Sequence, residues 1–406
     1  MGSEDFCNIP SLVDAMNKVT AAYKSSLLPD PAASPSPILS ETEVERQHLA
    51  SAARGLLAVV QEPRQAVLQL GLQGPLLACI RTAITLNIFG LIPHNSEGIT
   101  ATELQVKTGA DKALIIRIMR AMTSSKLVLE LGEERYAHTP TSLAFLSPVC
   151  GIFTHLFDEG LPTAWKIPEY LATMGYKDPN ENGMTAFQYA FQTHLPFFEW
   201  LGVHPKQRES YITGMSSSYR GGKSVGLAYP FDIELAGCTE NEVVMVDIGG
   251  NAGQLLVQIK ERFPQLSGRM IVQDRAETLK AAQQKQGIEY MPHDFFTPQP
   301  VIGAKAYYFR SIFHDWSDAF CRKILQNLVP SMTPGYSKLL ISDAVLPSVD
   351  APLYWALMDI QMMGISGLER TERQWRDLLE SEGLQIVKIW ASKAKDEFVI
   401  EAALPC

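Results

Sequence analysis

The chain has 406 residues, enough for two or three domains of ordinary size. Hydrophobic residues make up 46% of it and charged residues 19%, a globular composition that excludes wholesale disorder. Its 35 Lys and Arg against 44 Asp and Glu give a formal net charge of −9, which repels polyanions and anionic lipid surfaces. Composition therefore predicts no nucleic-acid partner.

The sequence shows no sign of a zinc site, a secretory signal or a membrane span. Its six cysteines lack the paired spacing of a structural zinc site, so we expect free thiols in a reducing compartment and no metal. The first ten residues, MGSEDFCNIP, contain neither a basic region nor an apolar core. No run of about 18 uncharged apolar residues is present. We therefore expect a cytoplasmic protein with no membrane association.

Residues 1–44 predict a helix followed by a tether. Apolar residues recur at helical spacing between Ile9 and Ser26, and the following segment is rich in proline and serine. Ser40 and Glu43 have the spacing of a capping box, which predicts the start of a helix. This helix would lead into a folded domain over residues 45–150.

A winged helix is predicted within that domain. Thr100 and Asp111 are each placed to cap a helix, and two short runs, 127–131 and 135–138, follow as a hairpin. This fold binds DNA in some proteins and serves as a dimerisation scaffold in others. The basic residues near the second helix are too sparse for a DNA-binding face, which favours the scaffold.

The next segment, residues 151–235, predicts helices with aromatic faces. Trp165, Tyr176, Phe191 and Trp200 belong to this aromatic series. Such residues carry much of a core's buried area, but the same pattern suits a pocket for a flat apolar substrate. The pattern alone leaves both interpretations open.

Residues 236–406 predict an α/β domain with a doubly wound sheet. From Glu242 on, short β-branched runs alternate with helical segments, which is typical of a parallel sheet covered by helices on both faces. The last two runs, 384–391 and 397–404, have no helix between them. We therefore expect a hairpin at the edge of the sheet.

A glycine turn follows the first strand of this domain. Asp247 precedes Gly249 and Gly250 where a strand gives way to a helix, and glycines at such a turn let the backbone approach a ligand closely. The turn lacks the spacing of a dinucleotide-binding motif. Its acidic residue would oppose a phosphate but suits a cationic ammonium group.

Two further acids follow the next two strands. Asp274 is placed to accept ribose hydroxyls, and Asp294 with Phe295 offers a carboxylate for an exocyclic amine and an aromatic edge for a purine. Each acid, taken singly, is also explained as a helix cap. Together the three acids predict a site for adenosine with an amino-acid tail.

A histidine follows the fourth strand. His314 lies where open α/β sheets bind ligands, and its ordinary pKa of about 6.5 suits general-base catalysis. Asp343, at the end of the fifth strand, and Glu369 are the two acids that could orient its ring. The three residues predict proton abstraction from a hydroxyl.

These motifs, together with HDWSD at 314–318, Asp359 before Met362-Met363, and ERTERQW at 369–375, resemble the small-molecule O-methyltransferase family of plants and fungi. The similarity covers residues 45–406 and is closest to the fungal natural-product branch. It implies a Rossmann-like methyltransferase domain behind an N-terminal helical and winged-helix dimerisation domain, and a homodimer.

The resemblance also implies roles for single residues. It implies that S-adenosylmethionine is bound by Asp247, Gly249, Gly250, Asp274, Asp294, Phe295 and Arg310. It implies His314 as the base that deprotonates a phenol or enol, flanked by Asp343 and Glu369. The implied substrate pocket includes His155, Phe191, Trp200, Asp359 and Met363.

Two residues depart from the family pattern: Asn251 replaces a glycine, and Asp343 replaces a glutamate. The same branch resembles pericyclases and dehydratases that keep S-adenosylmethionine without transferring its methyl group. In such an enzyme His314, Arg310 and His155 would donate hydrogen bonds to a carbonyl. A non-catalytic winged-helix binder is the third alternative.

Overall fold

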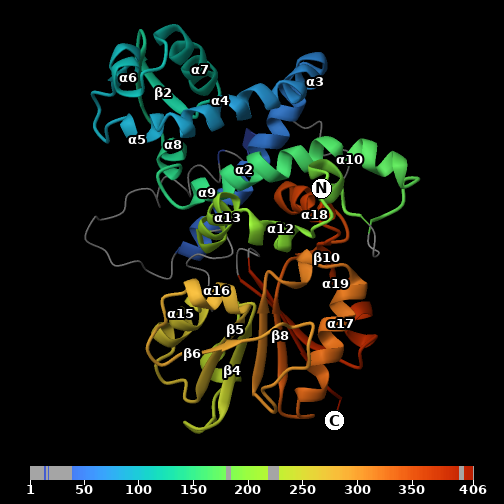
Figure 1. Cartoon of the computed structure of the whole chain (residues 1–406). Helices are drawn as coiled ribbons and strands as arrows, with labels where there is room; N and C mark the ends of the chain where they lie inside the picture. Colours follow the sequence, from blue (N-terminus) through green and yellow to red (C-terminus); the bar gives the residue numbers. More distant parts are fainter. Residues whose placement is uncertain are drawn as a thin grey trace. The chain divides into compact units, whose positions relative to one another are not determined.

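The computed structural model describes residues 13, 14, 17, 39–179, 184–217, 228–392 and 397–405. The chain divides into two compact units, Met1–Phe157 and Asp158–Cys406 (Figure 1). Most of the helix predicted over Ile9–Ser26, and the Pro/Ser-rich tether, lie outside the described residues. The predicted division at 44, 150 and 235 stays a prediction.

The first unit is mainly helical. Its helices are α2 (Leu39–Val60), α3 (Pro63–Gly71), α4 (Gln73–Thr85), α5 (Ile88–Leu91), α6 (Ala101–Thr108), α7 (Lys112–Ser124), α8 (Pro140–Ala144) and α9 (Val149–His155). Its strands are β1 (Ile99–Thr100), β2 (Val128–Gly132) and β3 (Arg135–His138), which form an antiparallel sheet in the order β1-β3-β2. Helix α2 begins one residue before the predicted cap, Ser40.

The predicted winged-helix elements are present in this unit. Thr100 forms a capping box with Glu103 at the start of α6, and the Asp111 carboxylate accepts the backbone N–H groups of Ala113 and Leu114 at the start of α7. Strands β2 and β3 pair antiparallel as the wing. These local polar contacts are the ones that the sequence signals specify.

The second unit begins with helices and continues as an α/β domain. The helical part contains the π-helical turn η2 (Leu156–Gly160), which crosses the boundary between the units, and α10 (Leu161–Thr173), α11 (Ala186–Phe191), α12 (Phe197–Val203), α13 (Pro205–Ser217) and α14 (Phe231–Glu234). The strands of the α/β part are β4 (Val243–Ile248), β5 (Arg269–Asp274), β6 (Glu289–Pro292), β7 (Ala306–Arg310), β8 (Lys338–Ser342), β11 (Gln385–Ala391) and β12 (Phe398–Ala403).

These seven strands form one sheet in the order β11-β12-β8-β7-β4-β5-β6. Strands β4 to β8 are parallel, whereas β12 runs antiparallel to both β8 and β11. The predicted hairpin at the sheet edge is thereby confirmed. The order reverses at β4 and β7, and open α/β sheets bind ligands beyond the carboxyl ends of the strands at such a switch point.

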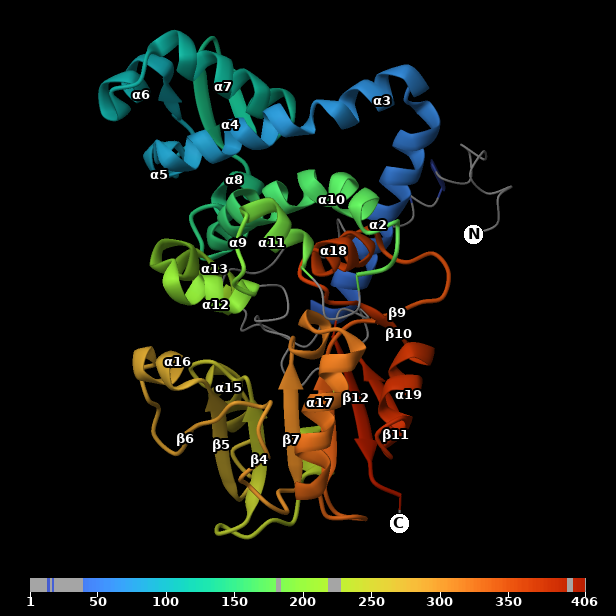
Figure 2. The same cartoon turned by 45° about the vertical axis from the view of Figure 1, so that its right-hand side comes forward.

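Helices cover both faces of this sheet (Figure 2). They are α15 (Gln254–Arg262), α16 (Ala276–Ala281), α17 (Asp318–Leu328) and α19 (Glu372–Glu380). Helix α18 (Leu353–Met363) lies instead beyond the carboxyl end of the strands. The chain also forms short turns η3 (Phe313–Asp315) and η4 (Val329–Ser331), and strands β9 (Val345–Leu346) and β10 (Arg370–Thr371) pair in parallel.

Alternation along the strands divides the core of the α/β part in two. Tyr307 and Phe309 of β7 pack with α17 and α19, whereas Tyr308 packs on the opposite face with α15. Successive side chains of a strand point to opposite faces, so one strand feeds both clusters. This buried sheet is a rigid base for the loops at its carboxyl end.

No single described helix is long and apolar enough to cross a membrane. A bent pair, α3 with α4, meets that criterion by length and composition only.

Candidate functional site

The predicted histidine lies on a short loop between β7 and α17. Phe313, fully buried, packs against Phe309 and Trp375 and anchors the loop in the core. Ser311 adopts a positive φ of 52°, which is uncommon for a residue with a side chain and turns the chain sharply after the strand. The 3-10 turn η3 then carries His314.

The His314 ring lies between two carboxylates. Its Nδ1 lies 2.9 Å from Glu369 Oε1, and its Nε2 lies 3.4 Å from Asp315 Oδ1. The Glu369 side chain is fully buried, and the His314 side chain is 11% exposed. An ionised carboxylate only accepts hydrogen bonds, so Glu369 holds the proton of the neutral ring on Nδ1. This leaves the lone pair of Nε2 to take a proton.

The backbone of Glu369 is held as well as its side chain. Its N–H donates to Asp359 Oδ1 at 2.9 Å. Burial raises the pKa of Asp359, and the nearby negative charges of Glu369 and Asp178 raise it further. Asp359, predicted as a substrate-pocket residue, therefore lies against the backbone of the acid that orients His314.

Asp343, the second predicted acid, contacts the same loop through its backbone. Its Oδ2 accepts the N–H of Phe313 at 3.1 Å. Asp343 is 3% exposed and directly follows β8. The aspartate in place of a glutamate thus holds the backbone beside His314, while a role on the ring itself stays a prediction.

The predicted glycine turn follows β4. Gly249 has a φ of 75°, and a Cβ on it would lie 2.5 Å from Ile312. A Cβ on Gly250 would collide with the Asp247 carboxylate. The two glycines therefore let the Ile312 and Asp247 side chains lie against the turn, as glycine's missing side chain allows.

Asp247 is the least satisfied acid of this turn. It is 1% exposed, and its Oδ2 has no hydrogen-bond partner among the described residues. Burial raises the pKa of Asp247 to about 7, the Arg310 charge opposes this rise, and the Asp274 charge adds to it. A buried carboxylate without a partner is costly. It therefore calls for a cationic ligand.

Asp274 and Asn251 close the other side of the turn. Asp274 Oδ2 accepts the N–H of Asn251 at 2.9 Å, and its Oδ1 accepts the N–H of Arg275 at 2.8 Å. Each oxygen keeps a second lone pair for a hydroxyl donor. Asn251 has a φ of 54°, a left-handed conformation that asparagine tolerates better than most residues, which explains how it replaces the family's glycine.

The third predicted acid follows β6. Asp294 Oδ1 accepts the N–H of Phe296 at 3.0 Å, which fixes the short turn that also carries Phe295. Phe295 packs against Phe296 at a ring separation of 4.9 Å. Arg310, at the end of β7, is partly buried. The acids near the ends of β4 and β5 and after β6 thus gather at one end of the sheet, as the sequence predicted.

A cationic nucleoside with an amino-acid tail fits this end of the sheet on observed features. Asp247 offers an unpaired buried carboxylate oxygen, and Asp274 offers free lone pairs. Among the described residues no group of three or more histidine, cysteine or acidic side chains is arranged to hold a metal ion.

The predicted pocket aromatics lie in a cluster next to the histidine loop. Trp200 is buried, Phe191 packs on it with ring centroids 5.1 Å apart, and Phe198 stacks on Trp316 at 5.9 Å. Two other aromatics of the predicted series, Trp165 and Tyr176, are 70% and 78% exposed and belong to no core. Phe191 and Trp200 thus pack mainly as core, and their contact with substrate stays a prediction.

The last two predicted pocket residues belong to different units of the chain. Met363, partly buried, ends α18 in the second unit, whereas His155 is buried at the end of α9 in the first unit. Their roles toward a substrate stay predictions.

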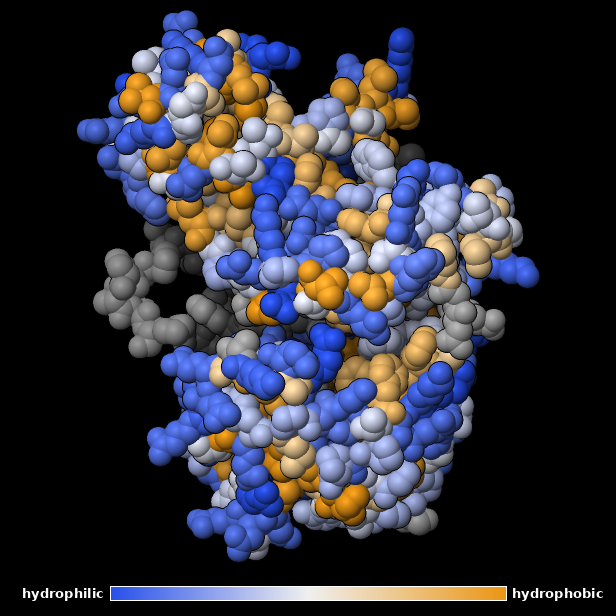
Figure 3. All heavy atoms as spheres, in the orientation of Figure 1, coloured by the Kyte–Doolittle hydropathy of each residue, from blue (hydrophilic) through white to orange (hydrophobic). Residues whose placement is uncertain are grey.

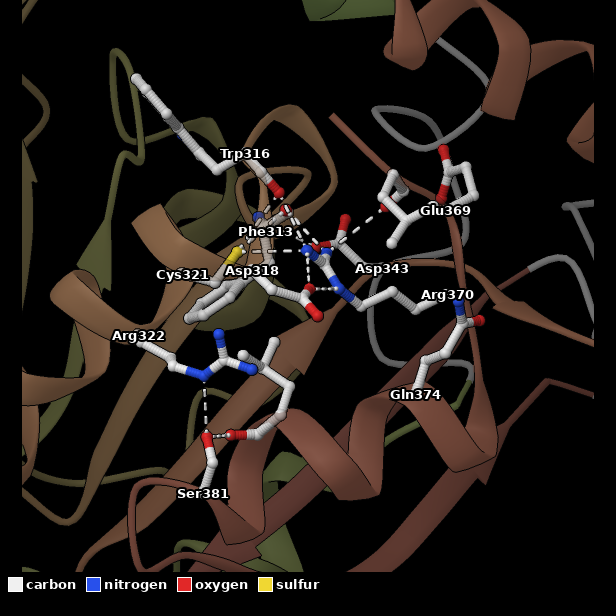
Figure 4. A network of polar contacts seen from close by, with 12 residues as sticks. Phe313, Trp316, Asp318, Cys321, Arg322, Asp343, Glu369, Arg370, Gln374 and Ser381 are labelled. Atoms are coloured by element: carbon white, nitrogen blue, oxygen red, sulfur yellow. Dashed lines mark hydrogen bonds and ion pairs between the residues drawn. The ribbon is translucent and has the colours of Figure 1, made fainter. Parts of the chain in front are cut away.

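Two residues of the histidine loop's surroundings have no assigned role in the sequence analysis. Asp315 faces Nε2 of His314, and the fully buried Arg370 binds the loop's backbone carbonyls (Figure 4). Both neighbour predicted catalytic residues in the chain. Their position next to predicted catalytic residues was the available sequence signal, but it does not show which neighbours contact the site.

The sheet with its switch point, the acidic turn and the oriented histidine form an α/β site whose chemistry suits a cationic nucleoside and a proton transfer. A family model described as an O-methyltransferase domain matches residues 171–385, and one described as an O-methyltransferase dimerisation domain matches residues 76–148. The chain belongs to the O-methyltransferase family.

Individual proteins show the same similarity. The demethylsterigmatocystin 6-O-methyltransferase of Aspergillus parasiticus is 38% identical over 333 residues, which cover 81% of this chain and 86% of that protein. A solved structure described as a pericyclic reaction enzyme matches with a TM-score of 0.85 and 27% identity, covering 98% of this chain and 100% of the other.

OxaC in complex with SAH and oxaline matches with a TM-score of 0.81 and 30% identity, covering 97% of this chain and 99% of that one. The predicted family, the methyltransferase class of enzyme and its cofactor, S-adenosylmethionine, are confirmed. The alternative of a non-catalytic winged-helix binder is therefore dropped.

Proposed function

We propose that the chain methylates a phenol or enol hydroxyl of a small aromatic or polyketide-type natural product, with His314 as general base. The observation that carries this proposal is the pair of Glu369 and His314. Their 2.9 Å contact at Nδ1 orients the ring so that Nε2 is the nitrogen that accepts the proton of a hydroxyl. A relative that methylates demethylsterigmatocystin supports an aromatic acceptor.

The cofactor supplies an electrophilic methyl group. Asp247, with its unpaired oxygen, would hold the cationic amino-acid tail, and Asp274 would accept the ribose hydroxyls. Asp294 and Phe295 would take the adenine, and Arg310 lies beside Asp247 in charge contact. These residues bind and orient, so most of the rate gain comes from placing the acceptor oxygen in line with the methyl group.

His314 takes the hydroxyl proton as the oxygen becomes nucleophilic. Glu369, bound at Nδ1, stabilises the positive charge that the ring gains. Asp315, 3.4 Å from Nε2, adds a second negative charge next to the imidazolium. The proton thus moves to a ring that is already flanked by acids.

Mass spectrometry tests this function. The purified full chain is incubated with S-adenosylmethionine and a panel of phenols and enols that includes demethylsterigmatocystin. We expect a product heavier by one methylene unit together with S-adenosylhomocysteine. His314→Ala is expected to abolish this product, and His194→Ala, at an exposed histidine, is the matched control. Full activity in His314→Ala would refute the role of the base.

A second candidate is a pericyclase or dehydratase that retains the cofactor unchanged. The match over 98% of this chain to a pericyclic reaction enzyme favours it. In that case Arg310, His155 or a protonated His314 would donate hydrogen bonds to a substrate carbonyl. An isomerised or dehydrated product with the cofactor intact would select this function over methyl transfer.

We propose that the chain forms a homodimer through its first unit. The dimerisation-domain match at 76–148 supports this. Apolar side chains are also exposed over α2 and α3 (Figure 3), namely Leu57, Val60, Val67, Leu68 and Leu70. Light scattering coupled to size-exclusion chromatography tests it: the expected mass is twice that of the chain. A cytoplasmic location and the lack of a nucleic-acid partner stay predictions from composition.

A further inference from the structure

The guanidinium of Arg370 is buried directly beneath the loop that carries His314. Arg370 is 0% exposed. Its Nη1 donates to the carbonyl oxygen of Phe313 at 2.9 Å, and its Nη2 donates to that of Trp316 at 2.9 Å. Figure 4 shows the guanidinium pointing into the loop between these two carbonyls. The two bonds fasten the chain on both sides of His314.

The charge of Arg370 is balanced by one acid at the start of α17. Asp318 Oδ1 accepts from Nε at 2.9 Å and from Nη2 at 2.8 Å. This pairing leaves the remaining N–H groups for backbone carbonyls, including that of Leu368 at 3.3 Å. The planar guanidinium, with five N–H donors, can bind the Asp318 carboxylate and the backbone carbonyls together. The compact ammonium of lysine cannot reach partners in so many directions.

The segment 368–370 holds the histidine loop at several points. The N–H of Leu368 donates to the His314 carbonyl at 2.9 Å, and Glu369 binds the His314 ring. Gly367 completes the approach, because a Cβ there would collide with the His314 carbonyl. The backbone and the ring of His314 are therefore both held by the segment 368–370.

We propose that Arg370 is a positioning residue for His314. It fixes the loop backbone so that the imidazole meets Glu369 at Nδ1 and presents Nε2 to the reacting hydroxyl. Its effect on turnover rests on the function proposed above, whereas its effect on the His314 ring does not. Since small misplacements of a reacting group cost up to about 100-fold in rate, loosening this loop is expected to lower turnover more than cofactor binding.

Arg370→Lys tests the proposal, because it keeps the charge and removes the fork. Arg376→Lys is the matched control, since Arg376 is exposed and pairs with Glu372 on the same helix, α19. The protein carries ¹³C at Cε1 of its histidines, and the His314 signal is assigned by its loss in His314→Ala. We measure that signal across pH, kcat, the KM for S-adenosylmethionine and the melting temperature.

We expect Arg370→Lys to shift the His314 signal and its titration, to lower kcat about 10- to 100-fold, and to leave the cofactor KM within about twofold. Arg376→Lys is expected to change none of these. A lower melting temperature with the His314 signal and titration unchanged would overturn the proposal, because Arg370 would then serve stability alone.

Asp318→Asn is the second variant, in case Arg370→Lys does not fold. It keeps the guanidinium and weakens its anchor, so a smaller shift of the His314 signal in the same direction is expected, and an unchanged signal would overturn the proposal. The signal needs no acceptor substrate. If the wild-type chain transfers no methyl group, the proposed function fails while this measurement still decides the role of Arg370.

Discussion

The histidine loop and the glycine turn, both at the carboxyl end of one sheet, are built in opposite ways. The histidine loop is crowded with partners that the chain itself supplies: Glu369 on the His314 ring, Asp343 on the backbone beside it, and Arg370 on its carbonyls. The glycine turn instead buries Asp247 with an oxygen that no described residue binds.

This difference follows from what each region has to do. A base must have its lone pair aimed before the substrate arrives, so its geometry is best fixed by the protein. A carboxylate that binds a cation needs an unsatisfied oxygen, and the protein bears the cost until the ligand is bound. Burial raises the pKa of Asp247 to about 7 because the ionised carboxylate is disfavoured there.

The largest effect that this comparison predicts is on His314. His314→Ala removes the ring that lies between Glu369 and Asp315, and we expect methyl transfer to fall by about 1,000-fold or more. Calorimetric affinity for S-adenosylmethionine is expected to stay within a few fold, since the ring is not part of the glycine turn. An equal loss of turnover and affinity would show that the two regions are not separable.

Glu369→Gln sharpens the same side of the comparison. The amide keeps the size of the side chain and can still bind Nδ1, but it carries no charge to stabilise the imidazolium and can itself donate to the ring. We expect kcat to fall about 100-fold with the cofactor affinity unchanged. The pH profile of kcat is the measurement, and a profile that matches the wild type would contradict the orienting role.

Much of this architecture could be predicted from the sequence, because the signals are local. The caps at Thr100 and Asp111 and the strand before the glycine turn, β4, depend on side chains that are close in the chain, and the structure has them where they were expected. The acids Asp247 and Asp274 were likewise found by their place after strands, which parallel topology brings to one edge.

What the sequence could not supply is the pairing between distant segments. Glu369 lies 55 residues from His314, and nothing in the spacing says that it, rather than Asp343, binds Nδ1. The burial of Arg370 could not be predicted either. Arginine side chains are mostly exposed, and this one is buried because the histidine loop folds over it. The exposure of Trp165 was not predictable either, because an aromatic series suits a buried core or a substrate pocket, and neither interpretation places the side chain in solvent.

On the other side of the comparison, Gly250→Ala tests how closely the turn is built around Asp247. The added Cβ would collide with the Asp247 carboxylate and lie 2.6 Å from Val272 Cγ2, so the turn must shift. We expect the affinity for S-adenosylmethionine to weaken on the order of 10- to 50-fold, with kcat at saturation little changed. Gly202→Ala is the control, because among the described residues no heavy atom other than those of its chain neighbours and its own helix backbone lies within 4 Å of a Cβ there. Unchanged affinity would mean that the turn does not contact the cofactor.

The smallest predicted effect is a pH dependence set by Asp247. A folded-state pKa of about 7, above the usual value, means that the folded chain binds one more proton than the unfolded chain between about pH 4 and 7. The free energy of unfolding of the ligand-free protein therefore falls as pH rises through this window. Asp247→Asn removes this fall, and its melting temperature should exceed that of the wild type at pH 8 by on the order of 5 °C.

Cofactor affinity has the opposite slope. A cationic group prefers the ionised carboxylate, so below about pH 7 binding must expel a proton, and affinity is expected to rise up to about tenfold between pH 6 and pH 8. Arg310 and Asp274, the charged groups that face Asp247, remain in Asp247→Asn, where the rise should disappear. Calorimetry in buffers of different ionisation enthalpy counts the protons directly. If the wild type releases no proton on binding at pH 6, Asp247 is already ionised there, and the contrast between the glycine turn and the histidine loop fails.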